Sequence, residues 1–134
     1  MQIHLKRGEK IYINGAVLRV DRRTSVEFLN DVDFLLENHV IQAEEATTPL
    51  RQLYFVVQTM LIDPANARMT AELFKHLAHK LDCATSSSEL RQALDDAGLK
   101  VQGGRYFDAL RLLRAAFAVE RDLMVHPLPG METQ

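Results

Sequence analysis

The stretch LKRGEKIYINGAVLRVDRR, residues 5–23, decides the fold of the N-terminal region. At its centre an Asn-Gly pair, Asn14-Gly15, lies between two short runs rich in apolar residues, which is the strongest short-range signal for a tight hairpin turn. A two-residue turn also sets the register, so that Tyr12 is expected opposite Val17 and the other pairs follow outward. The stretch therefore predicts an antiparallel β-hairpin.

The predicted register sorts the hairpin side chains onto two faces. The first face is apolar and is expected to join the core: Ile11, Ile13, Ala16, Leu18 and Val20. The second face is mixed, and its members are cross-strand neighbours: Lys10, Tyr12, Val17 and Arg19. Before the hairpin, Ile3 and Leu5 alternate with polar residues, which predicts a first, half-buried strand.

Positive charge is concentrated in this N-terminal segment. Residues 1–23 contain six basic and two acidic residues, a net charge of +4, whereas the whole chain of 134 residues has a formal net charge of -2. A basic segment on an otherwise acidic chain suggests a local anion-binding surface. The alternative is a set of solvated charges on strand edges, which discourage aggregation.

The chain after residue 23 is predicted to be helical. Signals for helix starts recur at residues 24–27, 48–49, 63–64, 86–89 and 103–105. Two of these signals are capping boxes, two place a proline in the first turn, and apolar side chains follow at helical spacing. The predicted fold class is therefore α+β, with a small N-terminal antiparallel β region, the hairpin plus the first strand, packed on about five α-helices.

The last predicted helix is the longest and runs from about Arg105 to Val125, while Gly98 is the predicted C-cap of the helix before it. Its apolar side chains form one seam: Tyr106, Leu110, Leu113, Phe117 and Met124. Glu120 occupies the one seam position that is not apolar. The seam is either intramolecular core or an interface with a second copy or a partner, and a single seam favours the core.

One domain is expected over residues 1–134, because a chain of this length forms one core. It divides into a basic β region over 1–23, a helical region over 24–126 and a loose tail over 127–134. No apolar run approaches the roughly 20 residues that span a bilayer, and the N-terminus is unlike a secretion signal. These features favour a cytoplasmic protein without a membrane partner.

Signals for catalysis are few. The sequence contains no P-loop, no dinucleotide fingerprint and no Gly-x-Ser-x-Gly elbow, so we expect neither an enzyme nor a cofactor. His76 and His79 could share a helix face as metal ligands, but histidines at this spacing are more often surface residues, and we expect no metal. Asp31 and Asp33, two apart on a predicted helix, should point to different faces. Cys83 is expected to be a buried thiol.

The polar face of the hairpin has the composition of a surface for single-stranded RNA. Such RNA is commonly held by an aromatic side chain that stacks on bases and by cations that contact phosphates. The alternative is that Tyr12 is an ordinary half-buried strand residue covered by the helices. The candidate RNA-binding residues are His4, Lys6, Arg7, Lys10, Tyr12, Arg19, Arg22 and Arg23.

Three stretches of the chain resemble one family. They are residues 5–23, the block FLNDVDFLLENHVIQAEEATTPLRQLYFVVQTMLIDP over residues 28–64, and ELRQALDDAGLKVQGGRYFDALRLLRAAF over residues 89–117. Together they resemble FlbT, a family of bacterial regulators of flagellin synthesis. The resemblance runs from Leu5 to about Val119, and its central block is long and nearly unbroken.

The resemblance implies a function that periodicity cannot show. FlbT proteins are post-transcriptional regulators that associate with the 5′ untranslated region of flagellin mRNA and promote its decay, which couples flagellin synthesis to flagellum assembly. The resemblance thus implies that this chain is a repressor whose partner is the flagellin mRNA leader, with no enzymatic activity. The alternative is a helical protein-interaction module that acts on mRNA only indirectly, through a flagellar regulatory partner or through a homo-oligomer.

Overall fold

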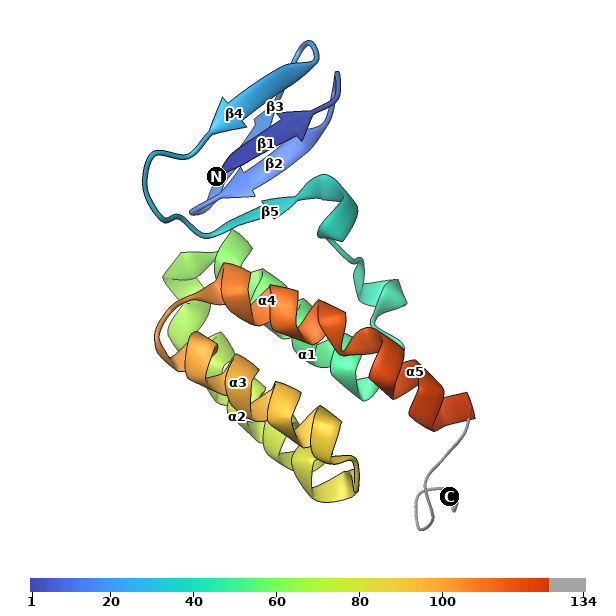
Figure 1. Cartoon of the computed structure of the whole chain (residues 1–134). Coiled ribbons are helices and arrows are strands. Elements are labelled where there is room, and N and C mark those ends of the chain that lie inside the picture. Colours follow the sequence, from blue (N-terminus) through green and yellow to red (C-terminus); the bar gives the residue numbers. More distant parts are fainter. Residues whose placement is uncertain (126–134) are drawn as a thin grey trace.

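Five short β-strands precede five α-helices in the computed structural model, which describes residues 1–125 (Figure 1). The strands are β1 (Gln2–Leu5), β2 (Lys10–Ile13), β3 (Ala16–Arg19), β4 (Thr24–Glu27) and β5 (Phe34–Leu36). The α-helices are α1 (Pro49–Ile62), α2 (Ala67–Ala84), α3 (Ser88–Gln102), α4 (Tyr106–Ala115) and α5 (Phe117–Val125). This arrangement confirms the predicted α+β class, while the predicted tail at 127–134 lies outside the described residues.

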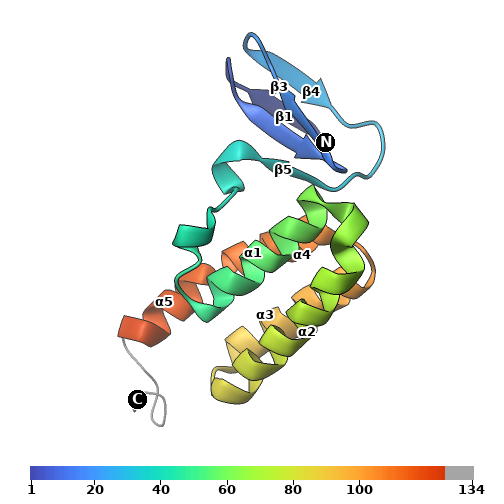
Figure 2. The ribbon, with the colours of Figure 1, turned by 180° about the vertical axis from the view of Figure 1, so that it is seen from behind.

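Three single turns of 3-10 helix connect these elements. They are η1 (Glu37–His39), η2 (Ala43–Glu45) and η3 (Pro64–Asn66). The first two carry the chain from β5 to α1, and the third links α1 to α2. Both views of the ribbon place the β region at one end of the helices, with β5 next to them (Figures 1 and 2). Within residues 1–125, no helix is long and apolar enough to cross a membrane.

The hairpin has the predicted register. β2 pairs with β3 so that Tyr12 lies opposite Val17, and the other predicted pairs follow. Asn14 and Gly15 both have positive φ, 48° and 86°, as a tight two-residue hairpin turn requires. A Cβ at Gly15 would lie 3.4 Å from the ring of Pro64, so this turn reaches the junction between α1 and α2.

The prediction of a helix that starts at residues 24–27 is wrong. Residues 24–27 form β4, which pairs antiparallel with β1 and sets Val26 opposite Ile3. Thr24 and Val26 are half-buried, while Ser25 and Glu27 are exposed, which is the period of a strand. The Thr-x-x-Glu pattern that resembles a capping box is compatible with both structures, and the pairing with β1 decides between them.

The strands form two small sheets that share an apolar interior. β1 and β4 make a two-stranded sheet, and the second sheet has the order β3-β2-β5. Leu5, Ile11 and Phe34 are buried together as the core of this β region. Leu18 on β3 was expected in the core but is 47% exposed, and Ala16 is also exposed, because β3 lies at the edge of its sheet.

Strand β5 joins the β region to the helices. Phe34 belongs to the core of the β region, while its neighbour Leu35 is buried in the larger helical core. Side chains alternate along a strand, so consecutive residues of β5 face opposite layers. Strand β5 therefore contributes to both cores, which also meet where Tyr12 packs against the helical core and where Phe107 packs against the core of the β region.

The helix ends depart from the predictions at three places. The side chain of Ser87, one residue after the predicted Ser86, accepts the N–H of Leu90 and caps α3. Gly98 lies inside α3, which continues to Gln102. The predicted long helix is two helices, because the chain turns at Ala116, whose N–H is shared among several carbonyls of the last turn of α4. The helical spacing of apolar residues continues across this break, so the sequence pattern alone does not indicate it.

The predicted seam is mostly intramolecular. Leu110 and Leu113 are fully buried in the helical core, and Tyr106 and Phe117 pack against it half-buried. Met124, near the end of α5, is 63% exposed. The core alternative therefore describes the seam as far as Phe117.

Candidate nucleic-acid interface

Two turns meet at the end of the β region that points away from the helices (Figure 1). One connects β1 to β2 and the other connects β3 to β4. The N–H of Gly8 donates to the carbonyl of Val20 at 2.8 Å, and the N–H of Val20 donates to the carbonyl of Glu9 at 3.2 Å. We call the exposed basic side chains at this end the basic tip: His4, Lys6, Arg7, Arg19, Arg22 and Arg23.

A shallow hollow in the surface of the basic tip collects four of the predicted residues. Its lining consists of His4, Leu5, Lys6, Arg7 and Arg23, and includes no carboxylate. The His4 ring is held by a 2.8 Å hydrogen bond between Nδ1 and the Ser25 hydroxyl on β4. The pairing of β1 with β4 thus brings residues far apart in the sequence into one positively charged depression.

The other side of the β1–β2 turn has mixed charge. Lys6 and Arg7 line a second hollow there, together with Glu9 and Glu37. The backbone N–H of Lys6 donates to the Glu9 carboxylate at 2.8 Å, and the N–H of Lys10 donates to the Glu37 carboxylate at 2.7 Å. The favourable side for an anion is therefore the hollow that faces β1 and β4.

Tyr12 lies apart from the basic tip, whereas Lys10 lies opposite Arg19 on β3. Tyr12 is half-buried and packs against the helical core, and Lys10 is also half-buried. Val17 and Arg19, on the neighbouring edge strand, are exposed. The predicted second face of the hairpin is therefore partly covered by the helices, and only part of Tyr12 is accessible. Stacking of a base on Tyr12 stays a prediction.

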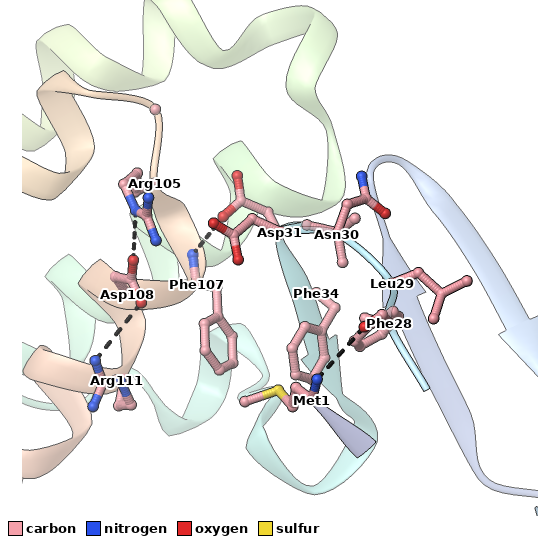
Figure 3. Close-up of a pocket in the computed structure, with 13 residues that line it drawn as sticks. Met1, Phe28, Leu29, Asn30, Asp31, Phe34, Arg105, Phe107, Asp108 and Arg111 are labelled. Carbon is pink, nitrogen blue, oxygen red and sulfur yellow. Dashed lines mark hydrogen bonds and ion pairs between the residues drawn. The ribbon is translucent and has the colours of Figure 1, made fainter. Parts of the chain in front are cut away.

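A second concave site lies where the β region meets the helices (Figure 3). This junction pocket has a volume of about 660 Å³ and is formed by Met1, the loop between β4 and β5, and the start of α4. Its apolar part is a row of phenylalanine rings. The centroids of Phe28 and Phe34 are 4.8 Å apart, and those of Phe34 and Phe107 are 4.4 Å apart in a stacked arrangement.

Charged side chains line the rim of the junction pocket. Asp108 accepts from Arg105 at 2.6 Å and lies 3.7 Å from Arg111. The hydrogen bond and the charge of Asp108 raise the pKa of the Arg105 guanidinium, with smaller contributions from Asp31 and Asp33. All five side chains thus belong to one electrostatic cluster.

Asp33 also anchors the loop of the junction pocket to α4. Its carboxylate accepts the N–H of Phe107 at 3.0 Å, near the N-terminus of that helix. The prediction that Asp31 and Asp33 lie on a helix is wrong, since both are in the loop before β5. The sequence carries no local signal for this pocket, because Phe28 and Phe107 lie far apart along the chain.

Cys83 and the two histidines considered as metal ligands lie on α2. Cys83 is exposed, not buried, and its Sγ lies 3.6 Å from Nε2 of His79. His76 and His79 are both exposed. Within residues 1–125, no group of three or more histidine, cysteine, aspartate or glutamate side chains has the arrangement of a metal site.

Comparisons with known proteins agree with one another. A family described as "Flagellar protein FlbT" matches residues 1–124. A protein of Rhizobium etli (strain CIAT 652), named "Probable flagellum biosynthesis repressor protein FlbT", is 48% identical over 130 residues, which cover 96% of this chain and 87% of that protein. Relatives with the same name from Mesorhizobium japonicum and Agrobacterium fabrum are 48% and 47% identical, covering 90% and 92% of this chain and 82% and 83% of their own length. No solved structure matches the chain significantly.

Proposed function

The chain belongs to the FlbT family, and from this premise we propose that it is a repressor of flagellum synthesis that binds the 5′ untranslated region of flagellin mRNA. Binding promotes degradation of the transcript or blocks its translation, which couples flagellin synthesis to flagellum assembly. Its relatives are named as repressors of flagellum biosynthesis, and in this proposal the nucleolytic step is carried out by other proteins of the cell.

The observation that supports RNA binding is the hollow of the basic tip. His4, Lys6, Arg7 and Arg23 line it without a carboxylate, on a chain whose formal net charge is -2. Basic residues that neutralise phosphates release counterions and dominate the affinity of most proteins for nucleic acid. The basic tip is also exposed and lies away from the helices, so a folded RNA leader can approach it (Figure 1).

The test compares two triple variants with the same change in charge. Lys6→Ala/Arg7→Ala/Arg23→Ala removes the cations of the hollow, while Arg68→Ala/Lys75→Ala/Lys80→Ala removes three exposed cations of α2. Affinity for a flagellin leader RNA is measured by fluorescence anisotropy over a series of salt concentrations. We expect the first variant alone to weaken binding and to reduce the slope of log K against log salt by about 2, since each phosphate contact on a single strand contributes about 0.7.

Equal losses in both triple variants would mean that binding follows overall charge, and the placement at the basic tip would be wrong. Unchanged affinity in both would exclude contacts between the RNA and these six cations, and the placement in the hollow would be wrong. Tyr12→Leu keeps the side chain apolar against the helical core and removes the aromatic ring. A weaker complex with an unchanged salt slope would indicate that the accessible part of Tyr12 stacks on a base.

The alternative function is a protein-interaction module. The predicted helix faces give it less support than the junction pocket does. Leu53, Val57 and Leu61 of α1 are buried in the helical core, as are Leu110 and Leu113 of α4. These faces are therefore occupied within the chain. Leu29, the most exposed large apolar side chain of residues 1–125, lies beside the junction pocket, while Met69 and Leu73 of α2 and Leu99 of α3 are also exposed.

A further inference from the structure

Leu29 is the most exposed of the large apolar side chains in the described part of the chain. It is 88% exposed and lies in the loop between β4 and β5, directly after Phe28. Figure 3 shows that its side chain points away from the stacked rings of Phe34 and Phe107 while it stands at the edge of the junction pocket. A projecting leucine and an open apolar hollow are therefore neighbours on one surface.

The charges of this surface are incompletely paired. Asp31 is exposed and makes no ion pair within residues 1–125. Arg111 is 62% exposed, and its one ion pair in that part of the chain is the 3.7 Å contact with Asp108, which already binds Arg105 at 2.6 Å. One anion and one cation thus remain available on opposite sides of the junction pocket (Figure 3).

A surface that carries a projection, a hollow, an anion and a cation is complementary to itself. In a twofold dimer the same patch meets its own copy, so that each feature of one chain faces the matching feature of the other. We propose that the chain forms a homodimer in which Leu29 of each copy enters the junction pocket of the other and Asp31 pairs with Arg111 across the interface. This inference goes beyond the proposed function and does not depend on RNA.

The charges favour a second copy over an unrelated partner. A peptide of one charge would complement either Asp31 or Arg111 but not both, whereas a twofold copy offers Asp31 a second cation and Arg111 a second anion beside Asp108. Burial of the Leu29 side chain against the phenylalanine rings supplies the apolar part of the association. The half-buried rings of Phe28 and Phe107 then lie at the centre of the interface, and the charged pairs form its rim.

The mass of the full chain in solution, measured over a concentration series by sedimentation equilibrium, tests the proposal. We expect the wild type to reach twice the mass of one chain, and Leu29→Asp to raise the dimer dissociation constant at least about tenfold. The matched control is Met124→Asp, which changes another exposed apolar residue, 63% accessible, at the far end of α5. Circular dichroism checks that each variant is folded.

Charge reversal sharpens the test. Asp31→Arg and Arg111→Asp should each weaken self-association, because each variant places like charges opposite one another in its own dimer. A mixture of the two variants should form a heterodimer, in which both cross-interface pairs again have opposite charge.

The proposal is overturned if the wild type stays monomeric, if Leu29→Asp dimerises as well as the wild type, or if Met124→Asp alone dissociates the dimer. Failure of the two reversed variants to associate when mixed would overturn the assigned Asp31–Arg111 contact. RNA affinity through the basic tip is a separate measurement, so either proposal can fail while the other stands.

Discussion

At the scale of single residues, Glu120 shows what a sequence pattern reveals and what it hides. Its place as the one polar position in an apolar seam was visible in the sequence, but its partners were not. The buried carboxylate accepts the Thr48 hydroxyl at 2.5 Å and the N–H of Leu50 at 2.9 Å. Glu120 of α5 thus caps the N-terminus of α1, where a negative charge is favourable.

Removal of this cap should destabilise the fold. We expect Glu120→Ala to lower the free energy of unfolding by about 2–4 kcal/mol, because it leaves buried donors of Thr48 and Leu50 without an acceptor. Glu120→Gln should cost less, since the amide oxygen can replace one bond. The matched control Asp122→Ala, at an exposed position of α5, should change stability by no more than about 0.5 kcal/mol. Urea denaturation measures all three, and an equal effect at both sites would contradict the capping role.

His39 should make stability depend on pH. Burial, and secondarily the charge of Arg114, lowers the pKa of His39 below its ordinary value of 6.5. The unfolded chain therefore takes up this proton at a higher pH than the folded chain does. The contribution of neutral His39 is fully present above pH 6.5 and is lost as the pH falls from there toward the lowered pKa of the folded state.

Thermal unfolding between about pH 7 and 5 checks this sign. His39→Gln should flatten the fall in stability over this range, while His76→Gln, on an exposed position of α2, should leave it unchanged. A fall that is the same in wild type and His39→Gln would assign the effect to other groups.

At the scale of elements, the sequence predicted what depends on neighbours along the chain. The Asn14-Gly15 turn and the start of α1 at Thr48-Pro49 are local patterns, and both are confirmed. Strand β4 was missed because it depends on pairing with β1, a distant element. The break at Ala116 was missed because the apolar spacing of the sequence continues across it.

At the same scale, alanine substitutions at two glycines should change the stability of the fold in opposite directions. Gly98→Ala lies inside α3, where a Cβ meets nothing within 4 Å, so it should stabilise the protein by about 0.5–1 kcal/mol. Gly15→Ala should destabilise it by about 1 kcal/mol or more, because the turn holds φ at 86°. The melting temperature of each variant, compared with that of the wild type, checks both predictions. A lower melting temperature for Gly98→Ala would contradict the place of Gly98 within a regular helix.

At the scale of the whole molecule, the candidate site was predictable in composition and not in shape. The charge excess of residues 1–23 pointed to the region, and the structure places His4, Lys6, Arg7 and Arg23 around one hollow. Which cations share it follows from the pairing of β1 with β4, which the sequence did not indicate. The junction pocket had no signal at all, since it is assembled from three separate segments.

Strand β5 has a consequence for how freely this protein can vary. Phe34 and Leu35 are adjacent along the chain but are buried in different cores. A change of size at either position must be accommodated by its own layer, and any shift of the strand is passed to the other. Edge strand β3 is exposed along its whole length, so its side chains are not constrained by packing in two cores. Substitutions should therefore accumulate most slowly in β5, the shortest strand of the described chain, and much faster in β3.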